Sequence, residues 1–138
     1  MTNLEKAKNN LGEHKISIVS STLSLTSDLR GVMPIIDFIN KGYDLSGASV
    51  ADLVVGKAAA MLFIKAGIKD VDTIIISKPA LKVLEEHHIT VKYEKLVDNI
   101  INRDKTGLCP FESLVLDVDD VSIAYKLIVE KLESFKKK

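Results

Sequence analysis

One stretch of the sequence, residues 50–64 (VADLVVGKAAAMLFI), restricts the possible folds more than any other. Its only charged residues are Asp52 and Lys57. A helix that is apolar on nearly all sides has to be buried between other layers of structure. Ser49 is a suitable helix N-cap, and Gly67 is a suitable helix end. The pattern therefore predicts a buried helix between Ser49 and Gly67.

Turn residues divide the rest of the chain into shorter elements. Alternating apolar and hydroxyl residues at 16–26 predict a β-hairpin. A continuous β-branched run at 71–77 predicts a central strand that is covered on both faces. The remaining predicted elements are a short helix or arm at 1–14, a helix from Pro34 to Gly42, a helix opened by Pro79, a strand at 89–93, a helix beginning at Cys109–Glu112 and a helix at 121–135.

These elements predict an α/β fold. The strand-helix-strand order between residues 71 and 93 requires a parallel crossover, whereas the hairpin is antiparallel. Helices are available for both faces of the sheet, so we expect a three-layer α/β/α sandwich with a mixed sheet of about five strands. A chain of 138 residues fits one such domain at 15–138, preceded by the arm at 1–14.

Composition excludes several classes of function. Nineteen basic and nineteen acidic residues cancel, and aromatic residues are only 5% of the chain, which disfavours nucleic-acid binding. No stretch is long and apolar enough to cross a membrane. The single cysteine and three histidines disfavour a disulfide framework or a zinc cage. We expect a cytoplasmic protein without a cofactor.

The two charged residues of the apolar stretch are candidates for proton transfer. A buried ammonium needs a partner, so Lys57 should reach an acidic group, an anionic ligand or solvent; its stem could also lie along the helix with its tip in water. Asp52 could instead complement the dipole of the predicted helix. Both could border one pocket near the start of that helix.

Cys109 is the candidate nucleophile. It precedes Pro110 at a predicted helix start, where free backbone N–H groups would stabilise a thiolate. The alternative is a small buried side chain, because free cysteine is among the most buried residue types. The candidate ligand-binding residues are Ser49, Arg103, Asp104, Thr106, Gly107 and Glu112.

Three segments carry a resemblance to a known family: residues 47–52 (GASVAD), 55–60 (VGKAAA) and 102–110 (NRDKTGLCP). Over residues 15–133 the chain resembles a small uncharacterised prokaryotic family whose members are labelled as deaminases. The resemblance implies a cytidine deaminase-like fold, with a pocket at the ends of two helices, and leads us to expect a homo-oligomer.

Zinc-dependent deaminases carry H-x-E at one helix start and P-C-x-x-C at another. Val50-Ala51-Asp52 takes the first place in this comparison, and the segment from Cys109 to Glu112 takes the second. Catalytic zinc needs three protein ligands, which these residues do not supply. The leading hypothesis is therefore a pocket for a small polar or nucleotide-like molecule. The alternative is a non-catalytic scaffold or regulatory module, and a zinc deaminase ranks below both.

Overall fold

The computed structural model describes residues 2–29, 31–100 and 110–136. Its elements are α1 (Asn3–Leu11), β1 (Ile16–Val19), β2 (Ser24–Ser27), α2 (Met33–Asn40), β3 (Ser49–Val55), α3 (Lys57–Ala66), β4 (Asp70–Ser77), α4 (Lys78–Glu86), β5 (Thr90–Val97), α5 (Pro110–Val115) and α6 (Val121–Lys136).

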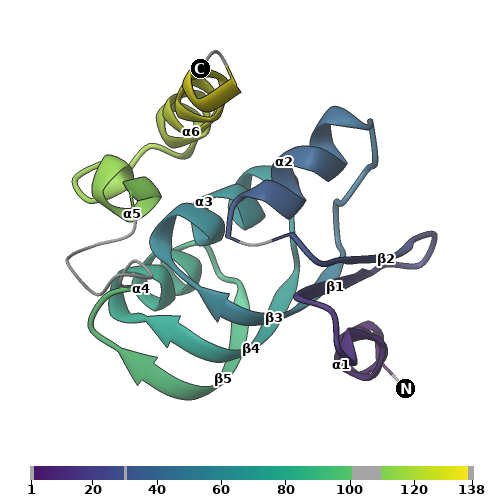
Figure 1. Cartoon of the computed structure of the whole chain (residues 1–138). Helices are drawn as coiled ribbons and strands as arrows, with labels where there is room; N and C mark the ends of the chain where they lie inside the picture. Colours follow the sequence, from purple (N-terminus) through teal and green to yellow (C-terminus); the bar gives the residue numbers. More distant parts are fainter. Residues whose placement is uncertain (1, 30, 101–109, 137–138) are drawn as a thin grey trace.

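A mixed five-stranded sheet forms the centre of the protein, with the strand order β2-β1-β3-β4-β5. β1 pairs antiparallel with β2 and with β3, whereas β3, β4 and β5 run parallel. The parallel strands are joined by α3 and α4, which lie on the same face of the sheet (Figure 1). The mixed α/β fold, the hairpin and the parallel crossover predicted from the sequence are thus confirmed.

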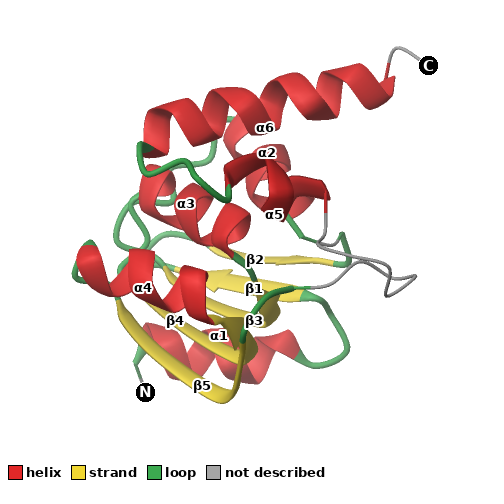
Figure 2. Ribbon diagram, turned by 90° about the vertical axis from the view of Figure 1, so that its left-hand side faces the viewer, coloured by secondary structure: helices red, strands yellow, loops and turns green. Residues whose placement is uncertain are grey.

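Helices cover the two faces of the sheet unequally. α2, α3 and α4 pack on one face, where the main core contains side chains such as Ile35, Val50 and Phe63. α6 and α5 pack outside α3 and form a further layer (Figure 2). On the other face, α1 contributes Ala7 to a small core with Val19 and Ala51.

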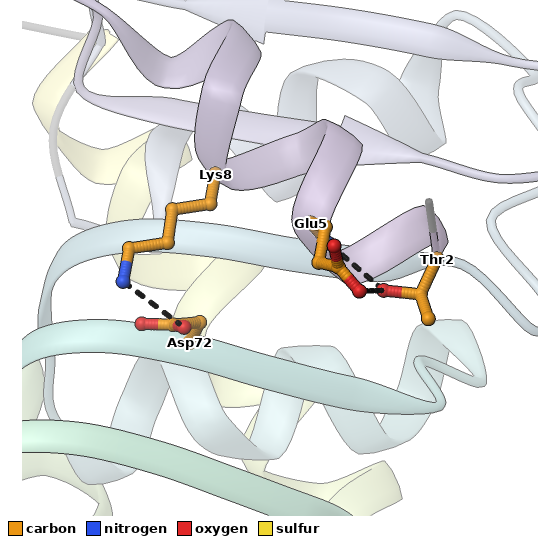
Figure 3. Close-up of polar contacts among 4 residues, drawn as sticks. All are labelled: Thr2, Glu5, Lys8 and Asp72. Atoms are coloured by element: carbon orange, nitrogen blue, oxygen red, sulfur yellow. Dashed lines mark hydrogen bonds and ion pairs between the residues drawn. The ribbon is translucent and has the colours of Figure 1, made fainter.

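A polar contact caps the start of α1, and another joins the helix to the sheet (Figure 3). The Thr2 hydroxyl oxygen accepts a hydrogen bond from the Glu5 N–H at 3.1 Å and so caps the helix. Farther along, the Lys8 ammonium lies 3.8 Å from a carboxylate oxygen of Asp72 in β4. Of the two alternatives predicted for residues 1–14, a short helix or an arm, the structure has the helix, which covers part of the sheet.

The predicted buried helix between Ser49 and Gly67 is wrong in its first half. Residues Ser49–Val55 form the central strand β3, and the helix begins only at Lys57. In a continuous apolar run, the spacing of the apolar residues does not distinguish a buried strand from a buried helix. Gly56, with extended backbone angles, is the junction, and Gly67 ends α3 at a φ of 81° as expected.

β4 also differs from its prediction in one respect. It is an internal strand, paired on both sides. The face of β4 on the side of α1 is only partly covered, because α1 does not extend over the whole strand. Ile74 is consequently 42% exposed. One face of β4 and β5 therefore remains open to solvent.

Candidate functional site

The sheet changes its regular pairing near the carboxyl end of β3. Pairing with β4 passes from Asp52 opposite Thr73 to Val54 opposite Ile75, without a Leu53 pair. The Leu53 N–H instead donates to the Asp52 carboxylate at 2.8 Å. Asp52 also lies opposite a residue of the main core in β1, so its side chain belongs to the face covered by α2–α4.

A cavity of about 260 Å³ lies at this place. Residues 52–54 of β3 form one side of the cavity, and Lys15, which immediately precedes β1, lies on a second side. Residues from the segment between β2 and α2 line the third side. The lining residues are Lys15, Leu29, Gly31, Pro34, Asp52, Leu53 and Val54. Ligands of open α/β sheets bind beside the carboxyl ends of parallel strands, which is where this cavity lies.

Asp52 is the unusual ionisable group of the cavity. It is only 9% exposed. Burial raises its pKa from 3.8 to about 8, although hydrogen bonds from the backbone of Leu53 and Val54 act in the opposite direction. Among the described residues, no cation lies within ion-pair distance of it. At neutral pH the Asp52 carboxyl is therefore mostly protonated and can both donate and accept a hydrogen bond.

The rest of the cavity wall is largely apolar. Leu29 and Val54 are large apolar side chains, 42% and 39% exposed. Pro34 is buried at the start of α2. Lys15 supplies a cationic side chain, and no described carboxylate forms an ion pair with it. The arrangement offers one buried hydrogen-bonding carboxyl, apolar walls and one positive charge.

A second polar cluster lies at the start of α3. The two carboxylate oxygens of Glu112, in α5, accept hydrogen bonds from the backbone N–H groups of Lys57 at 2.7 Å and Ala58 at 2.8 Å. Gly56 leaves the room for this carboxylate, because a Cβ at that position would overlap it. Burial raises the pKa of Glu112, while the two N–H groups and the Lys57 charge lower it.

Lys57 lies at the first position of α3, not in the middle of a helix as predicted. Its ammonium donates to the Leu116 carbonyl oxygen at 3.0 Å and lies 3.9 Å from a carboxylate oxygen of Asp119. Lys57 is only 8% exposed, so these two groups are the partners that its burial requires. The cluster of Lys57 and Glu112 ties α5 and the turn after it to the start of α3.

The structure separates residues that the sequence placed around one pocket. Asp52 lines the cavity, whereas Lys57 and Glu112 belong to the capped start of α3. Ser49 begins β3 and is absent from the cavity wall. The other candidates, Arg103, Asp104, Thr106, Gly107 and Cys109, lie outside the described residues.

Sequence reasoning missed Lys15 and the segment that leads into α2. No local signal marks Lys15 as a cavity residue, because its position depends on the antiparallel pairing of β1 with β3. That pairing becomes visible only once the strand order is known. The cavity is thus built by long-range topology, not by a local motif.

The zinc comparison also changes with the true helix boundaries. Val50-Ala51-Asp52 is part of β3, so it does not stand at a helix start. The actual starts of α3 and α4, at residues 56–60 and 77–83, contain no His, Cys, Asp or Glu. Across the described parts of the chain, no three such side chains form a metal-binding group. The residues at these helix starts do not fit catalytic zinc.

Comparison with known families gives a match over most of the chain. Residues 6–132 match the family described as "Domain of unknown function (DUF1893)". The chain belongs to the DUF1893 family. This membership covers the whole sheet and most of α6.

Solved structures include a DUF1893 family protein from Thermotoga maritima, TM1506. It is 29% identical to this chain, with a TM-score of 0.82 over 95% of this chain and 91% of TM1506. A diaminohydroxyphosphoribosylaminopyrimidine deaminase/5-amino-6-(5-phosphoribosylamino)uracil reductase from the same organism is 19% identical. Its TM-score is 0.45, over 66% of this chain and 34% of that one. A search of the curated proteins gave no match.

Within residues 2–29, 31–100 and 110–136, no helix combines the length and the apolar character that a membrane span requires.

Proposed function

We propose that this DUF1893 protein binds a small polar, nucleotide-like molecule in the cavity beside Asp52. The observation that carries the proposal is a buried carboxyl without a cationic partner among the described residues, in the middle of the parallel strand β3 and at the wall of a cavity. Such a group lowers the stability of the protein. A strongly perturbed ionisable group in a cavity is therefore a candidate for function.

The cavity favours a flat ligand with a hydrogen-bonding edge. A protonated carboxyl offers one donor and one acceptor side by side, which matches the adjacent acceptor and donor of a nucleobase edge. Leu29, Pro34 and Val54 can cover the faces of a ring, and Lys15 can pair with a phosphate or another anionic group. At about 260 Å³, the cavity is slightly smaller than the usual small-molecule site, whose volume range begins at about 300 Å³.

Asp52 is also suited to proton transfer. A carboxyl with a pKa of about 8 is poised near neutral pH, where general acids and bases work best. A ligand that carries an ionisable or exchangeable group would thus meet a proton donor or acceptor in the cavity. Turnover of each bound compound should therefore be measured together with its binding.

The test is a binding screen with nucleobases, nucleosides and nucleoside monophosphates, monitored by ligand-detected NMR and by thermal unfolding. Native mass spectrometry of gently purified protein reports any molecule that is retained. We expect at least one class to bind. Asp52→Leu, which keeps the branched shape of the side chain but removes its polar edge, should abolish this binding.

Two further variants separate the parts of the site. Lys15→Gln should weaken the phosphorylated compounds more than tenfold and leave the free bases nearly unaffected. Asp37→Asn removes a carboxylate from α2 outside the cavity wall and should bind like the wild type. Binding that survives Asp52→Leu, or a bare native mass together with no binding by any compound, overturns the proposal.

A further inference from the structure

β5 ends the sheet with a long open edge. It is the last strand of the order, eight residues long, and pairs only with β4 among the described strands. Six of its eight residues are exposed. The strand lies at the outer margin of the sheet in both views (Figures 1 and 2). The outward backbone N–H and C=O groups of such an edge are free to pair with another strand.

The side chains of β5 do not prevent this edge from pairing with β5 of a second copy of the chain. Lys92 and Glu94 carry opposite charges, are two residues apart and therefore lie on the same face of the strand. Neither forms an ion pair with another described residue. Tyr93 and Leu96, which are 44% and 39% exposed, add apolar surface along the strand. The edge therefore combines free backbone groups, unpaired opposite charges and exposed apolar side chains.

We propose that two copies of the chain associate through β5, as antiparallel strands related by a two-fold axis at Tyr93. Along an edge strand, only every second residue directs its backbone N–H and C=O groups outward. In an antiparallel pair, these residues must lie opposite one another to exchange hydrogen bonds. In a symmetric pair of identical strands, the two-fold axis must therefore pass beside one residue, which lies opposite the same residue of the second copy.

The charges select one of the central registers. A pair centred on Lys92 sets two lysines against each other, and a pair centred on Glu94 sets two glutamates against each other. A pair centred on Tyr93 instead sets Lys92 against the partner's Glu94, and does so twice because of the symmetry. The two five-stranded sheets then form one continuous sheet of ten strands.

Charge reversal tests the register. The oligomeric state is measured by sedimentation velocity over a range of protein concentrations. We expect the wild type to dimerise, and Lys92→Glu and Glu94→Lys each to weaken dimerisation at least tenfold. An equimolar mixture of these two variants should form a heterodimer, because both cross-strand pairs are again of opposite charge. The double exchange in one chain should restore the homodimer.

Lys126→Glu is the matched control, since it makes the same charge change on the exposed side of α6 and should leave the dimer intact. Circular dichroism reports whether each variant is folded. If one single variant fails to fold, the other single variant and the double exchange together test the register. Only with the axis at Tyr93 should the single reversal lose the dimer and the double exchange restore it. A monomeric wild type, or a dimer that resists both reversals, overturns the proposal.

Discussion

Replacing Asp52 with asparagine should make the protein more stable at neutral pH. The folded state holds the Asp52 proton up to a pKa of about 8, whereas the unfolded chain releases it near 3.8. Between these values the folded state binds the extra proton, so the free energy of unfolding falls as pH rises. Asparagine keeps an oxygen that can accept the Leu53 N–H bond but cannot ionise.

The size of the effect follows from the two pKa values. At pH 7 the pH is about three units above the ordinary pKa of Asp52 and still below its raised pKa in the folded state. At 1.36 kcal/mol per unit, the free energy of unfolding is lowered by roughly 4 kcal/mol. The penalty is nearly absent at pH 4 and reaches its full value above pH 8. Between pH 5 and pH 8 it should grow by roughly 3–4 kcal/mol.

The assay is urea unfolding of the wild type and Asp52→Asn at intervals from pH 5 to pH 8.5. The difference between the two proteins at each pH removes the contribution of groups that titrate alike in both, such as Glu112. We expect this difference to increase with pH in favour of the variant. Asp37→Asn removes a carboxylate that pairs with Lys41 at the surface, so it should change stability by at most about 0.5 kcal/mol. Parallel profiles for Asp52→Asn and the wild type would refute the reasoning, because the folded protein would then hold Asp52 in its charged form without cost.

Three substitutions test the helix caps by urea unfolding. Gly56→Ala places a methyl group on the Glu112 carboxylate and should cost about 1–3 kcal/mol. Glu112→Ala leaves two buried N–H groups of α3 without their acceptor and should cost about 2 kcal/mol. The Gly56→Ala cost should shrink in a Glu112→Ala background, and equal costs in both backgrounds would contradict the packing described. Ser77→Ala removes the hydroxyl that accepts the Ala80 N–H bond at the start of α4, so a loss of about 1 kcal/mol is expected and an unchanged stability would show that the cap is dispensable.

Much of the fold could be predicted from local signals. Pro34 and Pro79 mark the first turns of α2 and α4, and the alternating residues at 16–26 give the hairpin. These signals are local, because a proline or an alternating pattern restricts the backbone whatever surrounds it. The segment from Ser49 to Gly67 lacked such a signal, and there the prediction failed. Gly56 between two apolar runs was the available clue to the change from strand to helix.

The candidate site was predictable only in part. Asp52 stands out in the sequence as a charge in an apolar run, and it is buried, but in a strand and not in a helix start. The contact of Glu112 with Lys57 joins residues 55 positions apart, so neither could be assigned as a capping pair from local sequence. Lys15 joins the cavity through strand pairing. Residue type indicated which groups were unusual, and topology decided what they face.

The contrast between the two buried carboxyls supports assigning the function to the cavity. Glu112 accepts two N–H groups at a helix start, where the helix dipole also favours negative charge, and Lys57 lies beside it. These groups offset part of the cost of its burial, although its pKa is still raised above the ordinary value. Asp52 has backbone hydrogen bonds but no described cation, and its pKa rises to about 8. A buried carboxyl at the wall of a cavity without a cationic partner lowers stability, and a bound molecule could supply the interaction that residues 2–29, 31–100 and 110–136 do not provide. The two groups should therefore respond differently to a ligand, which would raise the stability of the wild type but not of a variant without the Asp52 carboxyl.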